Sequence, residues 1–458
     1  MTKITFIADT HHFSPTLTDG GRAFEMRSGS DQKCLIETGA IIDAAFDFIA
    51  KSDTGAVMIA GDLTDNGERA SHEEFRRKLY SLKEHKPVYV ITATHDWCSD
   101  KMPRRYMGDE IISDVPVLSA GELREYYYDF GPAQAKNEYI TDAGVCSYTV
   151  DLSDEVRLLA INDDTDGNGC AGYSGEHFDW IEKQIKEACA EGKTVIGMEH
   201  HLIMPHVHPL ISAFGMCVAN REAVASRLAD AGLKYMVTGH SHIHRISEFT
   251  SEKGNTIKQI NVGSLVGYPS PIVNLTFDGN DVRVETLTVP YFEFNGRQNT
   301  LDYTAKHLTD LVDKVLEAAM SKDNKLFEDR LAALGIRNKK IVDLHPVIRQ
   351  AAKRFSKLTV KGAYNILNPL TLGKVIDKKA VLEYKKIKVI DFVHQVLLAV
   401  IGGTPERHDE DSNYCKLVCQ VLSVPSFFVK NNKTLQQLPE VAREAVTGGK
   451  YDIRNCKL

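Results

Sequence analysis

The first 250 residues alternate short β-branched runs with amphipathic helical stretches, and this alternation constrains the fold more than any other feature. The expected strands are Ile4–Ala8, Ala56–Ala60, Val88–Thr92, Val156–Asn162, Thr194–Met198 and Tyr235–Thr238. The expected helices are Asp31–Ala50, Ser71–Leu82, Gly175–Ala190 and Arg221–Ala231. Strands that alternate with helices predict a layered α/β architecture.

The pattern changes between Thr256 and Val289, where consecutive segments alternate with period two. Such segments predict a β-meander, so we expect mixed sheets rather than one purely parallel sheet. After Phe294-Asn295-Gly296 the strand signal almost disappears. One helical face is marked at i, i+3, i+4, i+7 spacing by Leu308, Leu311, Val312, Val315, Leu316 and Ala319. We therefore predict an α/β domain over 1–296 and an all-helical domain over 297–458.

Composition limits the partners and the location of the chain. Its 458 residues are 43% apolar and 26% charged, and the formal net charge of −7 does not favour nucleic acid as a partner. No apolar run is long enough to predict a membrane span. The nine cysteines are scattered and odd in number, which predicts reduced thiols and a cytoplasmic protein. The oligomeric state is left open.

Acids and histidines follow the ends of five expected strands. The motifs are Asp9-Thr10-His11, Gly61-Asp62, His95-Asp96, Glu199-His200-His201 and Gly239-His240-Ser241-His242. Each motif alone is common, and a lone Gly-Asp is usually a turn. In open α/β sheets, however, ligands bind at the carboxyl ends of strands, so the set predicts one shared site. Carboxylates together with imidazoles favour Zn, Mn or Fe over Mg or Ca.

This set of motifs resembles the calcineurin-like metallophosphoesterase superfamily over roughly residues 1–290. The stretch Gly61–Glu68 with Ser71–Glu74 is similar to bacterial class III cyclic-nucleotide phosphodiesterase-like proteins, some of which carry a C-terminal helical domain. The resemblance implies a four-layer α/β/β/α sandwich with a C-terminal all-α domain. It also implies two divalent or trivalent transition-metal ions.

The resemblance assigns the ligands residue by residue. Asp9, His11, Asp62 and His242 would bind the first metal, and Asp62, His200 and His240 the second. His200 is preferred to its neighbour His201. The family has Gly-Asn where this chain has Ala93-Thr94, and a threonine hydroxyl is a shorter donor than an asparagine carbonyl. Thr94 would bind the second metal directly, or a water would take its place, or that site would be weak.

The ligand set implies a mechanism in which a hydroxide bridging the metals attacks the phosphorus. His95 resembles the family's general acid, and Asp96 would orient its imidazole. Arg22 and Arg27 are candidates to clamp the phosphate, with solvated loop arginines as the alternative. His201, His206 and His208 would line the substrate pocket, with a position on a rim loop as the alternative for the last two.

A phosphodiesterase acting on a small-molecule phosphoester is the leading functional hypothesis. A phosphomonoesterase on the same metal centre is the alternative within enzymes, because one such core cleaves either bond. The alternative of another class is a non-catalytic metal-bound scaffold that interacts through the helical domain.

Overall fold

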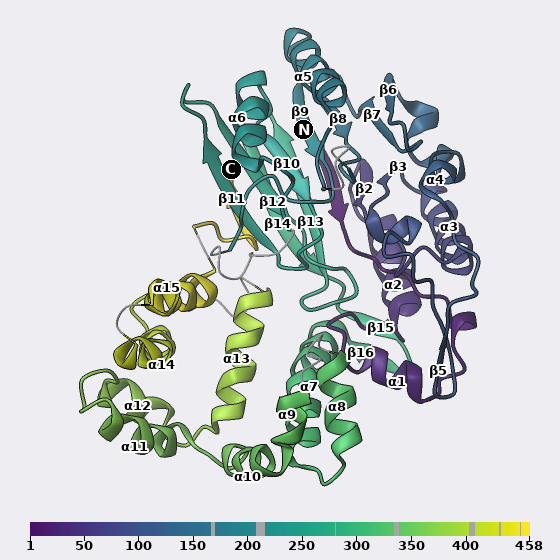
Figure 1. Cartoon of the computed structure of the whole chain (residues 1–458). Coiled ribbons are helices and arrows are strands. Elements are labelled where there is room, and N and C mark those ends of the chain that lie inside the picture. Colours follow the sequence, from purple (N-terminus) through teal and green to yellow (C-terminus); the bar gives the residue numbers. More distant parts are fainter. Residues whose placement is uncertain are drawn as a thin grey trace.

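The computed structural model describes residues 1–165, 170–207, 216–279, 281–333, 339–402, 408–429, 432–448 and 450–458. Two β-sheets pack face to face, and helices cover the outer face of each sheet (Figure 1). The expected α/β/β/α sandwich with a helical C-terminal region is therefore confirmed.

The first sheet has the strand order β17-β14-β13-β1-β2-β3. Strands β1, β2 and β3 are parallel, whereas β13, β14 and β17 join by antiparallel pairing. The bounds are β1 Thr2–Ile7, β2 Ala56–Ala60, β3 Val88–Ile91, β13 Pro271–Asp278, β14 Asp281–Thr288 and β17 Asn455–Lys457.

The second sheet has the order β11-β12-β10-β9-β8-β7-β6. Its central strands β8, β9, β10 and β12 are parallel, and antiparallel strands flank them. The bounds are β6 Asn137–Ile140, β7 Cys146–Asp151, β8 Val156–Ala160, β9 Thr194–Met198, β10 Tyr235–Thr238, β11 Arg245–Thr250 and β12 Thr256–Asn261. Mixed sheets were expected, and both sheets are mixed.

Side-chain alternation builds the core on both faces of each sheet. In β1, Ile4 and Phe6 join the core between the sheets, whereas Ile7 points to the outer helices. Because both faces are covered, β2 is buried at every position, which explains its unbroken apolar sequence. Helices α2 (Thr38–Ala50) and α3 (Arg69–Lys83) cover the first sheet, and α5 (Gly175–Ala190) and α6 (Arg221–Ala231) cover the second.

Two local predictions are wrong. The helix expected from Asp31 begins at Thr38, and the preceding residues form a loop beside the candidate site. The meander expected over 256–289 is split, because β12 pairs with β10 and β11 while β13 and β14 belong to the first sheet. Period-two alternation indicates a strand but does not specify its partner.

Shorter elements connect the layers. The helices are α1 Arg22–Ser28 and α4 Ala120–Tyr126, and the 3-10 turns are η1 Pro15–Leu17, η2 Thr94–Trp97, η3 Tyr128–Phe130 and η4 Pro132–Gln134. Two hairpins are formed by β4 Arg105–Met107 with β5 Glu110–Ile112, and by β15 Tyr291–Glu293 with β16 Arg297–Asn299. The turn of the second hairpin is the Asn295-Gly296 break.

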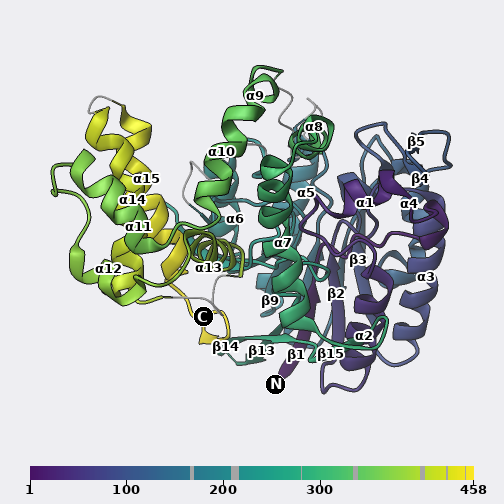
Figure 2. The ribbon, with the colours of Figure 1, turned by 90° about the horizontal axis from the view of Figure 1, so that it is seen from below.

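The C-terminal helices form an arc along one side of the sandwich (Figures 1 and 2). They are α7 Thr300–Met320, α8 Asn324–Ala333, α9 Lys339–Asp343, α10 His345–Phe355, α11 Val360–Leu370, α12 Lys378–Tyr384, α13 Val389–Gly402, α14 Asn413–Phe428 and α15 Lys433–Thr447. After α15 the chain returns to the first sheet as β17. This strand was not expected within a helical domain, and the boundary at residue 296 stays a prediction.

Within the described ranges, none of the helices is long and apolar enough to cross a lipid bilayer.

Candidate metal centre

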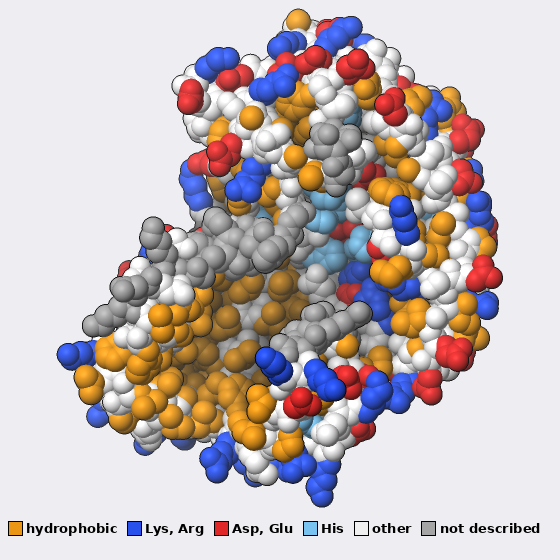
Figure 3. All heavy atoms as spheres, viewed as in Figure 1, with side chains coloured by type: hydrophobic (Ala, Val, Ile, Leu, Met, Phe, Trp, Pro, Cys, Tyr) orange, Lys and Arg blue, Asp and Glu red, His pale blue; other side chains and the backbone are white. Residues whose placement is uncertain are grey.

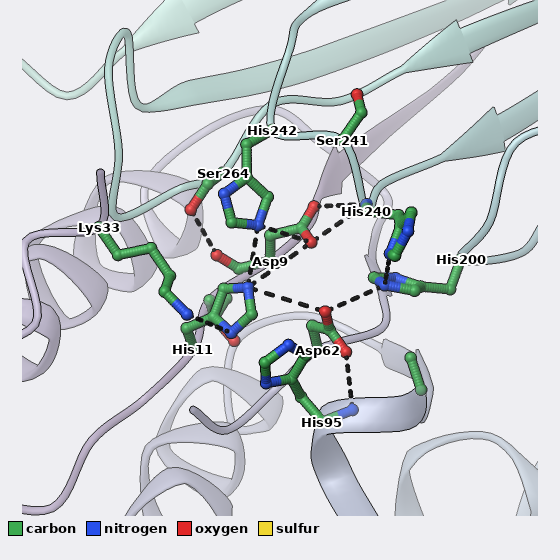
Figure 4. A network of polar contacts seen from close by, with 12 residues as sticks. Asp9, His11, Lys33, Asp62, His95, His200, His240, Ser241, His242 and Ser264 are labelled. Carbon is green, nitrogen blue, oxygen red and sulfur yellow. Dashed lines mark hydrogen bonds and ion pairs between the residues drawn. The ribbon is translucent and has the colours of Figure 1, made fainter. Parts of the chain in front are cut away.

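The candidate site lies where the carboxyl ends of strands from both sheets meet. Asp9 and Asp62 follow β1 and β2 of the first sheet, whereas His200 and His240 follow β9 and β10 of the second. The sequence predicted one shared site at the ends of strands, and the structure shows that strands of two different sheets contribute to it (Figure 4). On the molecular surface, histidine side chains gather in a hollow of the face shown in Figure 3.

Four side chains form a first lobe of this site. His11 Nε2 lies 3.0 Å from His242 Nε2, 3.8 Å from Asp9 Oδ1 and 3.7 Å from Asp62 Oδ2. His242 Nε2 lies 3.3 Å from Asp9 Oδ1. All four side chains are buried or nearly so; ligand atoms of Asp9, His11 and His242 lie within 4.8 Å of one another, and Asp62 lies against His11 (Figure 4).

A second lobe shares Asp62 with the first. His200 Nε2 lies 3.0 Å from Asp62 Oδ2 and 3.2 Å from His240 Nδ1. His200 Nδ1 contacts the Ala60 carbonyl oxygen at 2.9 Å, which directs Nε2 toward the site. One Asp62 oxygen therefore faces both lobes, as a carboxylate that bridges two cations would.

The residues fit two transition-metal ions. Metal–nitrogen and metal–oxygen bonds of about 2.1 Å place adjacent octahedral ligands about 3.0 Å apart. The nitrogen–nitrogen separations of 3.0 Å in the first lobe and 3.2 Å in the second match that spacing. Burial lowers the pKa values of His11 and His240, which favours the neutral imidazoles that bind metal.

Backbone conformation supports the same assignment. Asp9, His11, Asp62, His240 and His242 all have positive φ angles, between 37° and 68°. Residues other than glycine rarely adopt this left-handed region, and such residues cluster at functional sites. Here the conformation turns each side chain from its strand end into the shared site.

Two glycines give the ligands room. A Cβ atom at Gly61 would lie 2.6 Å from His200 Nδ1, and one at Gly239 would lie 2.6 Å from Asp9 Oδ2. Gly61 also has a φ of +82°. Close packing therefore requires glycine at both positions, and the positive φ of Gly61 adds a backbone reason in the Gly-Asp motif.

His95 lies beside the bridge, but Asp96 does not orient it. The His95 backbone NH donates to Asp62 Oδ1 at 3.2 Å, and its ring lies edge-on to His11. His95 Nδ1 contacts the backbone carbonyl of Asp65, not the Asp96 carboxylate.

The Asp96 carboxylate holds the surrounding backbone instead. It accepts hydrogen bonds from the backbone NH groups of Thr64 and Ala93, both at 2.9 Å. The expected pairing of Asp96 with the His95 imidazole is therefore wrong, because these two backbone NH groups already occupy the carboxylate oxygens. Asp96 positions the loop that carries His95.

Thr94 begins η2, one residue before the amide that donates to Asp62. It is half-buried and lines a cavity next to His201. Its role as a ligand of the second metal stays a prediction.

The two arginines occupy different surroundings. Arg22 is 53% exposed and pairs with Asp329 of α8 at 3.1 Å, so the structure does not bring it to the cluster. Arg27 pairs with Asp31 and lies 3.4 Å from Asp65. Arg27 is therefore held near the first lobe. Its guanidinium contacts two carboxylates there, and its predicted role as a phosphate clamp stays a prediction.

The loop before α2 contributes two residues that the sequence did not reveal. Lys33 Nζ lies 2.8 Å from Asp65 Oδ1 and 3.5 Å from His11 Nδ1. The Gln32 carboxamide contacts His242 Nδ1 at 2.6 Å. The sequence predicted that Gln32 and Lys33 belong to an amphipathic helix, so no motif indicated that they are part of the site.

The remaining histidines have supporting contacts. His201 Nδ1 and its backbone NH both contact the Asp163 carboxylate, at 3.2 Å and 2.7 Å, and its ring lies 4.3 Å from the ring of His240. His206 Nε2 lies 2.8 Å from Ser241 Oγ, and burial lowers its pKa to about 3. His206 therefore supports the 239–242 loop from behind, and His208 lies outside the described residues.

Comparisons with known proteins agree with this geometry. The calcineurin-like phosphoesterase family profile matches residues 2–244, more than half of the chain. A comparison with curated protein sequences gives no match.

Solved structures give distant similarities. One is a dimetal phosphatase from Danio rerio, with 11% identity and a TM-score of 0.44, covering 66% of this chain and 98% of that one. Another is the purple acid phosphatase PPD1 from yellow lupin seeds, with 14% identity and a TM-score of 0.40, covering 63% and 51%. These two likenesses are too weak to carry the assignment, which depends on the family match: the chain belongs to the calcineurin-like phosphoesterase family.

Proposed function

We propose that this metal-dependent phosphoester hydrolase cleaves small phosphodiesters and uses two ions drawn from Mn, Fe and Zn. The observation that carries the proposal is the Asp62 carboxylate, which faces His11 on one side and His200 on the other. A pair of ions bound there would supply a nucleophile at neutral pH and neutralise the phosphoryl oxygens.

The chain's own residues supply the remaining chemistry. The Nδ1 contact of His95 with the Asp65 carbonyl leaves Nε2 as the nitrogen that exchanges a proton with the substrate. His95 would protonate the departing oxygen as general acid. The hydrogen bond from the His95 backbone NH to Asp62 sets the position of His95 relative to the bridging carboxylate.

Two cationic side chains, Lys33 and Arg27, lie beside the first lobe, and each pairs with the Asp31 and Asp65 carboxylates. Lys33 and Arg27 both lie near the buried Asp65 carboxylate. Although burial raises the pKa of Asp65, these two cations hold it well below its usual value. The ionised Asp65 fixes both cations close to where a phosphate would bind.

The test is turnover of bis(4-nitrophenyl) phosphate by protein reconstituted separately with Mn²⁺, Fe²⁺ and Zn²⁺, with 4-nitrophenyl phosphate as the monoester. We expect the diester to be cleaved faster with at least one metal, and chelation to abolish the activity. Faster cleavage of the monoester would correct the assignment to phosphomonoesterase. Two bound metals without turnover of either ester would favour the scaffold alternative.

A further inference from the structure

A cavity of about 710 Å³ opens beside the second lobe. Its wall includes Thr94 and Trp97 from η2, together with Asp164 and His201. The His201 ring lies 4.3 Å, centroid to centroid, from the ring of His240. The volume suits a small molecule, and the position suits the organic part of a substrate whose phosphorus lies at the metals.

Asp164 lines this cavity, and one of its carboxylate oxygens is buried without a hydrogen-bond partner among the described residues. The residue is 8% exposed, and Oδ2 accepts hydrogen bonds from Trp97 Nε1 at 3.0 Å and Asn162 Nδ2 at 3.1 Å. Oδ1 has no hydrogen-bond partner among the described residues. A buried carboxylate oxygen without a donor is costly, and a bound water, ion or ligand that donates to it would remove that cost.

The groups around Asp164 determine which kind of hydrogen-bond donor on a ligand its carboxylate would attract. The neighbouring Asp163 carboxylate is occupied by His201, and the described residues that line the cavity include no lysine or arginine. Burial first, and Asp163 second, raise the pKa of Asp164 to about 6. A second anion would be repelled here, whereas a cation would be attracted, and the half-buried indole of Trp97 adds an aromatic surface.

We propose that this cavity binds the organic group of the substrate and that Asp164 Oδ1 accepts a hydrogen bond from an amino group on it. The inference depends on the proposed function, because it assigns a substrate class to the same site. The preferred substrate is a phosphodiester of an amino alcohol, with the ammonium group against Asp164 and Trp97.

The experiment compares two isosteric esters, 2-aminoethyl 4-nitrophenyl phosphate and propyl 4-nitrophenyl phosphate, on the metal-loaded full-length protein. We expect kcat/KM to favour the aminoethyl ester by about tenfold to a hundredfold, the scale of a hydrogen bond to a charged group. Asp164→Asn should bring this ratio close to one. Its amide oxygen would still accept from Trp97 and Asn162, while its NH₂ group would present a donor to the cavity.

A matched control is Asp179→Asn, which removes a carboxylate that is 77% exposed on α5 and should leave the ratio unchanged. A ratio near one in the natural protein, or a preference that survives Asp164→Asn, would overturn the proposal. So would loss of a third equivalent of metal in Asp164→Asn, because that would make Asp163, Asp164 and His201 a cation site.

Failure of the proposed function is distinguishable from failure of this inference. If neither ester is hydrolysed, the proposed function fails. Calorimetric Kd values for 2-aminoethyl phosphate and propyl phosphate then test Asp164 by itself. Equal affinities in the natural protein would contradict its role, and a preference lost in Asp164→Asn would support it.

Discussion

The two lobes of the metal centre differ in how they are built. Among the described residues, the first lobe combines Asp62 with Asp9, His11 and His242, whereas the second combines Asp62 with His200 and His240. The first lobe thus has one more acidic or histidine side chain. The second lobe reaches an equal number of ligands only if Thr94 or a water completes it.

The lobes also differ in what supports them. Gln32 and Lys33 contact the histidines of the first lobe from the loop before α2. His307 of α7 contacts the Asp31 backbone carbonyl in that loop at 2.9 Å, and Arg330 of α8 contacts the Gly29 carbonyl at 3.1 Å. The helical region therefore supports the first lobe, whereas the second is held by contacts within the sandwich. This difference predicts a tighter first site.

Removal of the shared ligand should have the largest effect, because it breaks both lobes. We expect Asp62→Ala to lose most of its bound metal and to reduce turnover to background, while the C-terminal helices stay folded. Elemental analysis and circular dichroism measure these two results. Full metal content in this variant would show that Asp62 is not the bridge.

His95 lies close to His11 and Asp62, but we expect it to act as a general acid and not as a ligand, so its removal should separate rate from metal binding. His95→Ala should lower kcat by about 10²- to 10⁴-fold with both metals retained, the usual contribution of a general acid. The loss should shrink for esters with good leaving groups, which depart without a proton. An equal loss across a series of leaving groups would contradict this role.

The two glycines allow the two lobes to be disturbed to different degrees. Gly239→Ala places a Cβ against Asp9 and should weaken the first site more, whereas Gly61→Ala places one against His200 and should weaken the second more. A loss of about 10- to 100-fold in affinity is the scale for disturbing groups that orient a ligand. Metal titration followed by calorimetry measures both sites. If both variants weakened the same site more than the other, the division into lobes would be wrong.

The smallest effect, and the sharpest test of the difference between lobes, is expected at Thr94. If its hydroxyl binds the second metal, Thr94→Asn should tighten that site by up to about tenfold through a longer carbonyl donor, and Thr94→Ala should loosen it. Activity should then saturate at lower manganese in Thr94→Asn than in the natural protein. Identical second-site affinities in all three proteins would mean that another group completes the lobe.

The sequence by itself predicted a layered α/β fold and the strand-end acids and histidines, and its resemblance to a family predicted the four-layer sandwich and the ligand set. The short, fully apolar β2 run predicted a strand covered on both faces, and helices α5 and α6 begin and end at the predicted residues. Asp9, Asp62, His200 and His240 could be found because each follows directly after a strand, where the end of local structure and the position of the side chain coincide.

Only the tertiary structure decided which groups meet across the chain. The contact of Lys33 with His11, the support of His95 by the Asp65 carbonyl and the unsatisfied oxygen of Asp164 join segments that no local pattern relates. The return of β17 to the first sheet is of the same kind. Periodicity specifies which face of an element is buried, but the partner on that face is selected by packing of the whole chain.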